Sequence, residues 1–147
     1  MSIEIRVSGM PPKKRTDTSL WNNGPEVPRV IALRRAARAA FGGRGPFKSH
    51  IRLRLSIFLN STDFFSSQVG DLDNFISGVC DALQAASPQA GIHEQFRLAE
   101  NEDITPSTAI AIENDLAVVS IVADKFLANE QDQTHYNIVI EGGFDQS

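Results

Sequence analysis

Apolar residues at every second position mark two segments of this chain as strands, and this alternation constrains the fold more than any other feature. Residues 3–7 alternate between aliphatic and polar side chains, and residues 51–57 do the same. In the second segment, Arg52 and Arg54 occupy the outer positions. A period of two is typical of a strand with one face in the core and the other in solvent. The sequence therefore predicts two half-buried strands, the second with a basic outer face.

The remaining apolar patterns complete the order of elements. Apolar residues recur at helical spacing between 30 and 41 and again from Leu72 to about Ala86. A continuous apolar run from Val118 to Ala123 predicts a central strand, and residues 136–140 predict the last strand. The resulting order, β-α-β-α-β-β, favours an α+β fold of two layers: a small mixed sheet with helices packed on one face.

Length and composition favour one domain over residues 1–147. The stretch 87–113 is acidic and weakly periodic, so we expect it to form a surface insertion in that domain. The only cysteine is Cys80, which excludes a disulfide framework within one chain and favours a reducing compartment. The N-terminus lacks the pattern of a signal peptide, and no apolar stretch approaches the roughly 20 residues of a membrane span. We therefore expect a cytoplasmic protein without a membrane partner.

Charge is distributed unevenly along the chain. Residues 1–54 hold 12 of the 14 Lys and Arg residues but only three acids, whereas residues 55–147 hold two basic residues and 15 acids. Such asymmetry is compatible with a face that binds a polyanion, or with two halves that pair their charges across the surface. The candidates for contacts with a phosphate backbone are Arg34, Arg35, Arg38, Arg52 and Arg54.

Two acidic motifs are the candidates for chemistry. The first is Gly70-Asp71-Leu72-Asp73-Asn74, where the second helix is expected to start. Helix capping alone would explain these residue types at that position. The second motif, Glu113-Asn114-Asp115, directly precedes the apolar run. If that strand lies beside the helix start, Asp115 approaches Asp71 and Asp73, and three clustered carboxylates suit Mg²⁺ or Mn²⁺. Such an ion can activate water for attack on a phosphodiester.

These motifs resemble those of the RusA-type Holliday-junction resolvases. The stretch from Gly70 to Phe75, continuing to Asp81-Ala82-Leu83, is similar to the acidic helix of that family. The stretch from Asn114 to Val119 is similar to its second acidic motif, and the N-terminal strand followed by Pro11-Pro12 matches its opening. The resemblance implies a homodimeric endonuclease that cuts branched DNA with Mg²⁺. It also implies that Asp71, Asp73 and Asp115 bind the metal as catalytic residues and that Lys125 contacts phosphate.

The chain departs from the family pattern at two places. The family carries a lysine one turn into the acidic helix, where this chain has Ser77, and Lys13, Lys14 or Arg15 would have to supply that cation. The acidic stretch 87–113 is also longer than the family's link. Both departures motivate an alternative, a catalytically weak or inactive relative that binds nucleic acid or a protein. A third hypothesis, an enzyme that uses an Asp-x-Asp pair on a phosphorylated small molecule, fits poorly because no apolar strand precedes the acids.

Overall fold

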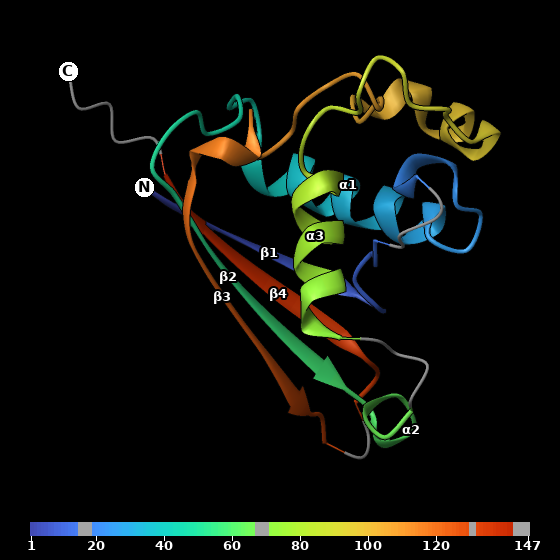
Figure 1. Cartoon of the computed structure of the whole chain (residues 1–147), viewed down its shortest axis with the longest axis vertical. Helices are drawn as coiled ribbons and strands as arrows, with labels where there is room; N and C mark the ends of the chain where they lie inside the picture. The colour runs from blue at the N-terminus through green and yellow to red at the C-terminus, as the bar shows by residue number, and fades with distance from the viewer. Residues whose placement is uncertain (15–18, 67–70, 130–131, 143–147) are drawn as a thin grey trace.

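A four-stranded mixed sheet forms one layer of the structure, a computed structural model that describes residues 1–14, 19–66, 71–129 and 132–142 (Figure 1). The strands, in their order across the sheet, are β1 (Ser2–Ser8), β4 (His135–Glu141), β2 (Ile51–Leu59) and β3 (Val118–Leu127). β1 pairs antiparallel with β4, β4 pairs antiparallel with β2, and β2 pairs parallel with β3.

The helices form the second layer, on one face of the sheet. The long helix α1 (Val27–Phe41) and the helix α3 (Leu72–Ala82) cover this face, and the short α2 (Ser61–Phe64) follows β2 (Figure 1). Three 3-10 turns complete the fold: η1 (Leu20–Asn22), η2 (Glu94–Glu102) and η3 (Asp115–Ala117). The prediction of a mixed sheet with helices on one face is confirmed.

The core lies between the two layers, because the alternating residues of the strands point toward the helices. Ile5, Leu55 and Ile138 are almost fully buried on this face of the sheet, and α1 adds Leu33 and Phe41. The alternate positions of β1 and β2 are exposed, apart from half-buried ones at the end of β2. The period of two in the sequence therefore corresponds to a sheet with one covered face and one open face.

The prediction that residues 118–123 form a central strand is wrong in its placement. These residues begin β3, which pairs only with β2 and forms one edge of the sheet. Most of its side chains are exposed, including Val119 at 59% and Val122 at 41%. A continuous apolar run is typical of a strand buried on both faces, but here it lies at the border of the sheet.

The stretch 87–113 does not lie wholly on the surface. It contains η2, and its side chains at Phe96, Ile104 and Ile112 are buried in the core. The main chain joins it to the segment before β2, because the N–H of Phe47 donates to the carbonyl of Ala111 at 3.0 Å. The described acidic side chains of this stretch, Glu94, Glu102, Asp103 and Glu113, remain exposed.

No helix in the described ranges combines the length and the apolar character that crossing a bilayer would require.

Candidate functional site

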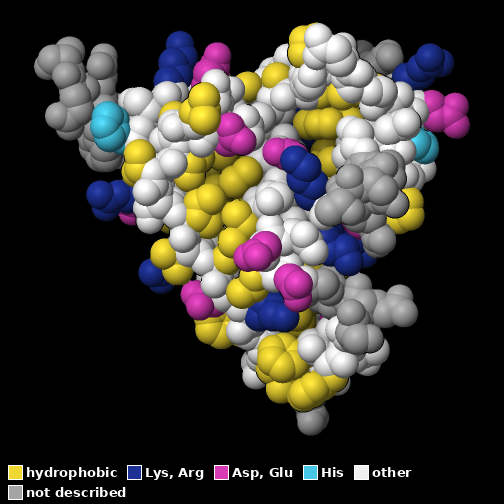
Figure 2. Space-filling model, viewed as in Figure 1, with side chains coloured by type: hydrophobic (Ala, Val, Ile, Leu, Met, Phe, Trp, Pro, Cys, Tyr) yellow, Lys and Arg dark blue, Asp and Glu magenta, His cyan; other side chains and the backbone are white. Residues whose placement is uncertain are grey.

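The main candidate site is a groove of about 500 Å³ between α3 and the first half of β3. From α3 it is lined by Ile76, Ser77, Cys80 and Asp81, and from β3 by the residues Val118 to Ile121. Lys14 and Asp115 complete its walls. Figure 2 shows the same region from outside, with an apolar patch over β3 and charged side chains of both signs beside it over α3.

The segment at Pro12 and Lys13 crosses α3 directly at Gly78. A Cβ atom at this position would lie 2.1 Å from the carbonyl oxygen of Pro12, so only glycine permits the crossing. The N–H of Lys14 then donates to the carbonyl of Asn74 at 3.1 Å. The Lys14 ammonium reaches the Asp81 carboxylate at 3.0 Å, although both side chains remain partly exposed. A close backbone approach therefore fixes one cation at the groove.

Asp71 and Asp73 lie at the N-terminal end of α3. Asp71 occupies the N-cap position but its carboxylate makes no capping hydrogen bond, and Asp73 lies in the first turn. Both are exposed. Capping explains why these residue types suit the position, yet neither carboxylate has a hydrogen-bond or ion-pair partner among the described residues.

Asp115 lies at the opposite end of α3. Its N–H donates to the Gln84 side chain at 3.1 Å, just beyond the last turn of the helix. Its charge also acts on Cys80: burial, together with the smaller effects of the Asp81 and Asp115 carboxylates, raises the pKa of that thiol to about 11. Asp115 therefore shares its end of the groove with Asp81.

The three aspartates of one chain do not form a single metal site. Asp73 and Asp81 are eight residues apart on one helix, which corresponds to roughly 12 Å along its axis. Asp115 lies at the Asp81 end, and no group of three His, Cys, Asp or Glu residues within the described ranges is close enough to hold a metal ion. The expected convergence of Asp115 with Asp71 and Asp73 is not found within one chain, so these three carboxylates do not together form a Mg²⁺ site in it.

Asp81 is the acidic residue of the groove to which sequence reasoning gave no role. The signal was present in the spacing, because Asp73, Ser77 and Asp81 follow one another at intervals of four and so lie on one side of a helix. Ser77, which stands where the family with similar motifs has a lysine, is exposed and lines the groove. Lys14 supplies a cation on the same side of α3.

The expectation that Arg34 contacts DNA is wrong. Its side chain is fully buried, and its guanidinium donates five hydrogen bonds to main-chain carbonyls at 2.6 to 3.0 Å. It also lies 5.0 Å from the centre of the Trp21 ring. Burial lowers the pKa of Arg34 to about 10, with the nearby charge of Arg38 as a smaller cause, so the group stays charged at neutral pH. Helical spacing alone did not distinguish this arginine from its exposed neighbours.

Two further arginines of α1 bond to residues of the acidic stretch 87–113. Arg35 forms two hydrogen bonds of 2.7 Å with the Glu102 carboxylate, which raises the pKa of Arg35 and lowers that of Glu102. Arg38 donates to the carbonyl of Asp103 at 3.0 Å. The interpretation that the two halves of the chain pair their charges therefore holds for this part of the surface.

The other basic candidates differ in accessibility. Lys125 is exposed in the second half of β3, and by alternation its side chain lies on the helix-covered face with those of Val119 and Ile121. Lys13 is half-buried, and its N–H donates to Glu26 at 2.8 Å. Arg15 lies outside the described residues.

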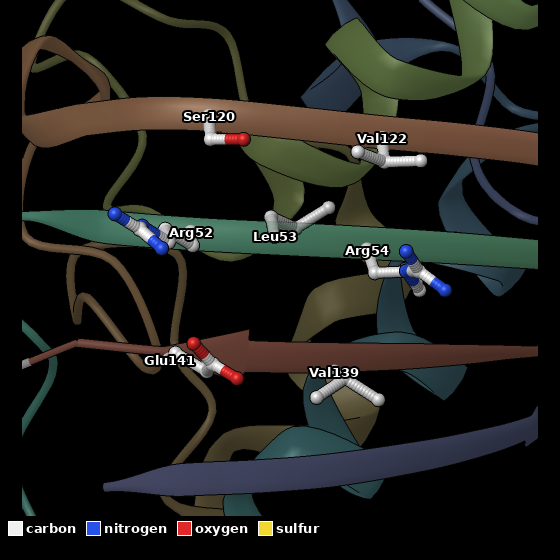
Figure 3. A pocket seen from close by; sticks show the side chains of 7 residues that line it. All are labelled: Arg52, Leu53, Arg54, Ser120, Val122, Val139 and Glu141. Carbon is white, nitrogen blue, oxygen red and sulfur yellow. The ribbon is translucent and has the colours of Figure 1, made fainter.

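Arg52 and Arg54 lie on the open face of the sheet, away from the groove. They line a shallow pocket of about 290 Å³, together with Ser120 and Val122 of β3 and Glu141 of β4. Figure 3 shows both guanidinium groups on β2 between these two strands. Neither forms an ion pair with another described residue, so both remain available to an anionic ligand.

The fold defines a class, small two-layer α+β domains with a mixed sheet, rather than a particular protein. No family model matches the chain, and no curated protein matches it. The resemblance carried by the two acidic motifs therefore remains a prediction.

Proposed function

We propose that this protein is a structure-selective DNA endonuclease that hydrolyses phosphodiester bonds at branched DNA, in the manner of the Holliday-junction resolvases it resembles. One observation carries the proposal: Asp81 and Asp115 line the α3–β3 groove beside Lys14, and the exposed Asp71 and Asp73 lie at the other end of the same helix, with no capping bond at Asp71. Carboxylates beside a phosphate position water or a hydrated cation, and lysines balance the phosphate charge. The proposal includes Mg²⁺ or Mn²⁺ as the cofactor, a homodimeric state and a cytoplasmic location.

The residues of the chain take separate roles in this proposal. The proposed catalytic carboxylates are Asp71 and Asp73 at the start of α3 and Asp115 at the other end of that helix. Lys14 and Lys125 contact the phosphates. Arg52 and Arg54 bind more distant phosphates from the open face. Arg34 has no place in this set because it is buried, and Arg35 and Arg38 would have to leave Glu102 and Asp103 before they could take part.

A second candidate is a nucleic-acid-binding or protein-binding module with little or no catalytic activity. Two observations favour it: Ser77 stands on the groove where the resembling family has a lysine, and the three aspartates do not converge within one chain. A module of this kind would bind DNA in a salt-sensitive way, without any need for a divalent metal.

Cleavage of a synthetic four-way junction, with and without Mg²⁺, separates the two candidates. The endonuclease predicts metal-dependent cutting that is reduced at least 100-fold in Asp73→Asn. Asp132→Asn, which removes an exposed carboxylate in the connection between β3 and β4 and has no proposed role, is the matched control and should cut like the wild type. Salt-sensitive binding of the same junction in EDTA, without cutting under any condition, would instead establish the binding module.

A further inference from the structure

The open face of the sheet carries a row of three stacked aromatic rings. Phe126 of β3, Phe58 of β2 and His135 of β4 lie directly opposite one another in the sheet. The Phe58 ring stacks on both neighbours, with centroid distances of 5.1 Å to Phe126 and 4.9 Å to His135. The His135 ring is held in this position because its Nδ1 donates to the carbonyl of Gln133 at 2.9 Å. This ring row crosses three of the four strands.

The ring row is accessible at both of its ends. Phe126 is 43% exposed at the edge of the sheet, and Phe58 and His135 are half-buried. On the other side of His135, the residue directly opposite in β1 is Ser8, which is small and exposed. A flat aromatic group can therefore continue the stack at either end of the ring row.

Two arginines follow the ring row along the same strand. Arg54 and Arg52 precede Phe58 by four and six residues, so all three side chains lie on the open face. At about 3.3 Å per residue, the two positions lie roughly 13 and 20 Å from the ring row. Neither guanidinium forms an ion pair with a described residue, and both line the shallow pocket of Figure 3. A stacking surface and a cationic segment therefore share β2.

Single-stranded nucleic acid is the ligand that combines flat, unpaired bases with a chain of phosphates. We infer that the open face binds single-stranded nucleic acid, with a base stacked on the ring row and phosphates bound by Arg54 and Arg52. By analogy, RNA-recognition domains stack bases on aromatic side chains of a four-stranded sheet. The spacing between rings and arginines suits a strand of several nucleotides. In a duplex the bases stack on one another, so none is free to extend the ring row.

Two carboxylates on the open face separate stacking from simple attraction of charge. Asp124 lies between the ring row and Arg54, opposite Ser56, and Glu141 lies opposite Arg52. Both carboxylates are exposed and repel phosphate. Charge alone therefore gives this face little preference for an anion, and stacking has to contribute. The inference thus predicts a preference for unpaired bases over charge density, and it does not rest on cutting at the α3–β3 groove.

The surface is tested by fluorescence anisotropy of labelled oligonucleotides in EDTA, where metal-dependent cutting cannot occur. Single strands of oligo-dT and oligo-rU, each about 12 nucleotides long, are the probes. At least one of them should bind, and the tighter one identifies DNA or RNA as the preferred ligand. A duplex of the same length carries more charge but should bind roughly tenfold more weakly than that strand, because it offers no free base.

Substitutions on the open face separate the two parts of the surface. Phe126→Ala should weaken binding of the preferred strand by roughly 5- to 100-fold, the effect of one lost stacking contact. Its matched control is Leu127→Ala, which removes the next exposed apolar side chain of β3 on the other face and should bind like the wild type. Arg54→Ala should reduce the slope of log K against log salt concentration by about 0.7. Arg97→Ala, at an exposed arginine of η2, should leave that slope unchanged. Far-ultraviolet circular dichroism should show the same fold in all four variants.

Three results would overturn the inference. They are a wild type that binds neither single strand, which would leave the open face to a protein, a duplex that binds as tightly as the single strand, and binding that Phe126→Ala does not change. The outcome is also separable from that of the proposed function. A protein that cuts junctions but binds no single strand would count against this surface alone, whereas a protein that binds the single strand through Phe126 but cuts no junction would count against the proposed function alone.

Discussion

Replacing Arg34 by methionine should destabilise the domain more than any change at an exposed arginine. The guanidinium joins α1 to the end of α3 and to the segment after η2, because it donates to the carbonyls of Ala82 and Gln84 and to those of Ile104, Thr105 and Thr108. Methionine has a similar length and fills most of the space, but it leaves these carbonyls without their donor. The substitution therefore tests hydrogen bonding rather than packing.

The size of the effect follows from the balance between burial and hydrogen bonding. Burial of the charge is unfavourable, as the lowered pKa of about 10 shows, and the five hydrogen bonds offset that cost. Each buried carbonyl left without its donor costs about 1–3 kcal/mol. Because removing the buried charge offsets part of that sum, we expect a net loss of about 3–5 kcal/mol for the five carbonyls together. A domain of this size has roughly 5–15 kcal/mol of stability, so Arg34→Met should lower the melting temperature by roughly 10 °C or more.

Urea unfolding, followed by far-ultraviolet circular dichroism and by the fluorescence of the single tryptophan, Trp21, gives the measurement. Arg34→Lys keeps the charge but loses the forked geometry, and it should fall between the wild type and Arg34→Met. The matched control is Arg35→Met, which removes an exposed arginine from the same helix and should unfold close to the wild type. A loss below about 1 kcal/mol for Arg34→Met would refute the structural role of this arginine.

Three further predictions follow from the buried groups. Gly78→Ala should destabilise the domain by roughly 1–3 kcal/mol in urea unfolding, because the clash with the Pro12 carbonyl outweighs the better helix propensity of alanine; an increase in stability would contradict the close crossing. Tyr136→Phe should stabilise the domain by about 1 kcal/mol, since the Tyr136 hydroxyl is buried without a partner among the described residues; a loss of stability would instead point to a partner for that hydroxyl. Burial raises the pKa of the Cys80 thiol to about 11, so unfolding releases its proton more readily and stability should fall as pH rises from about 9 to about 11. At pH 10 this contribution is roughly 1 kcal/mol, and Cys80→Ala should lack it when unfolding is compared at pH 8 and pH 10.

Local periodicity predicted the elements of the fold but not their neighbours in the sheet. The alternation of Ile3 to Val7 and of Ile51 to Ile57 identified which side of each strand is buried, because that pattern depends on one strand and one core. The order of strands depends on long-range pairing, which no local pattern contains. The run Val118–Ala123 therefore suggested a central strand, although its apolar side chains lie at an open edge.

The candidate site shows the same limit for single side chains. Arg34, Arg35 and Arg38 occur close together in a helix, and sequence alone treated them as one basic face. In the structure the first is buried, and the other two bond to residues of the acidic stretch more than 60 positions away. The surroundings of the three arginines differ because η2 and the chain after it lie over α1. The weak periodicity of residues 87–113 did not reveal this placement.

The separation of the acidic motifs follows from topology. In a β-α-β connection between parallel strands, the helix returns antiparallel to the strands, so the start of the helix and the start of the second strand lie at opposite ends of the sheet. β2 and β3 are parallel, and α3 connects them. Asp71, which precedes the helix, and Asp115, which precedes β3, therefore lie at opposite ends of the sheet. The hydrogen bond from the Asp115 N–H to the Gln84 side chain holds the second motif just beyond the C-terminal end of α3, so the two motifs stay apart within one chain.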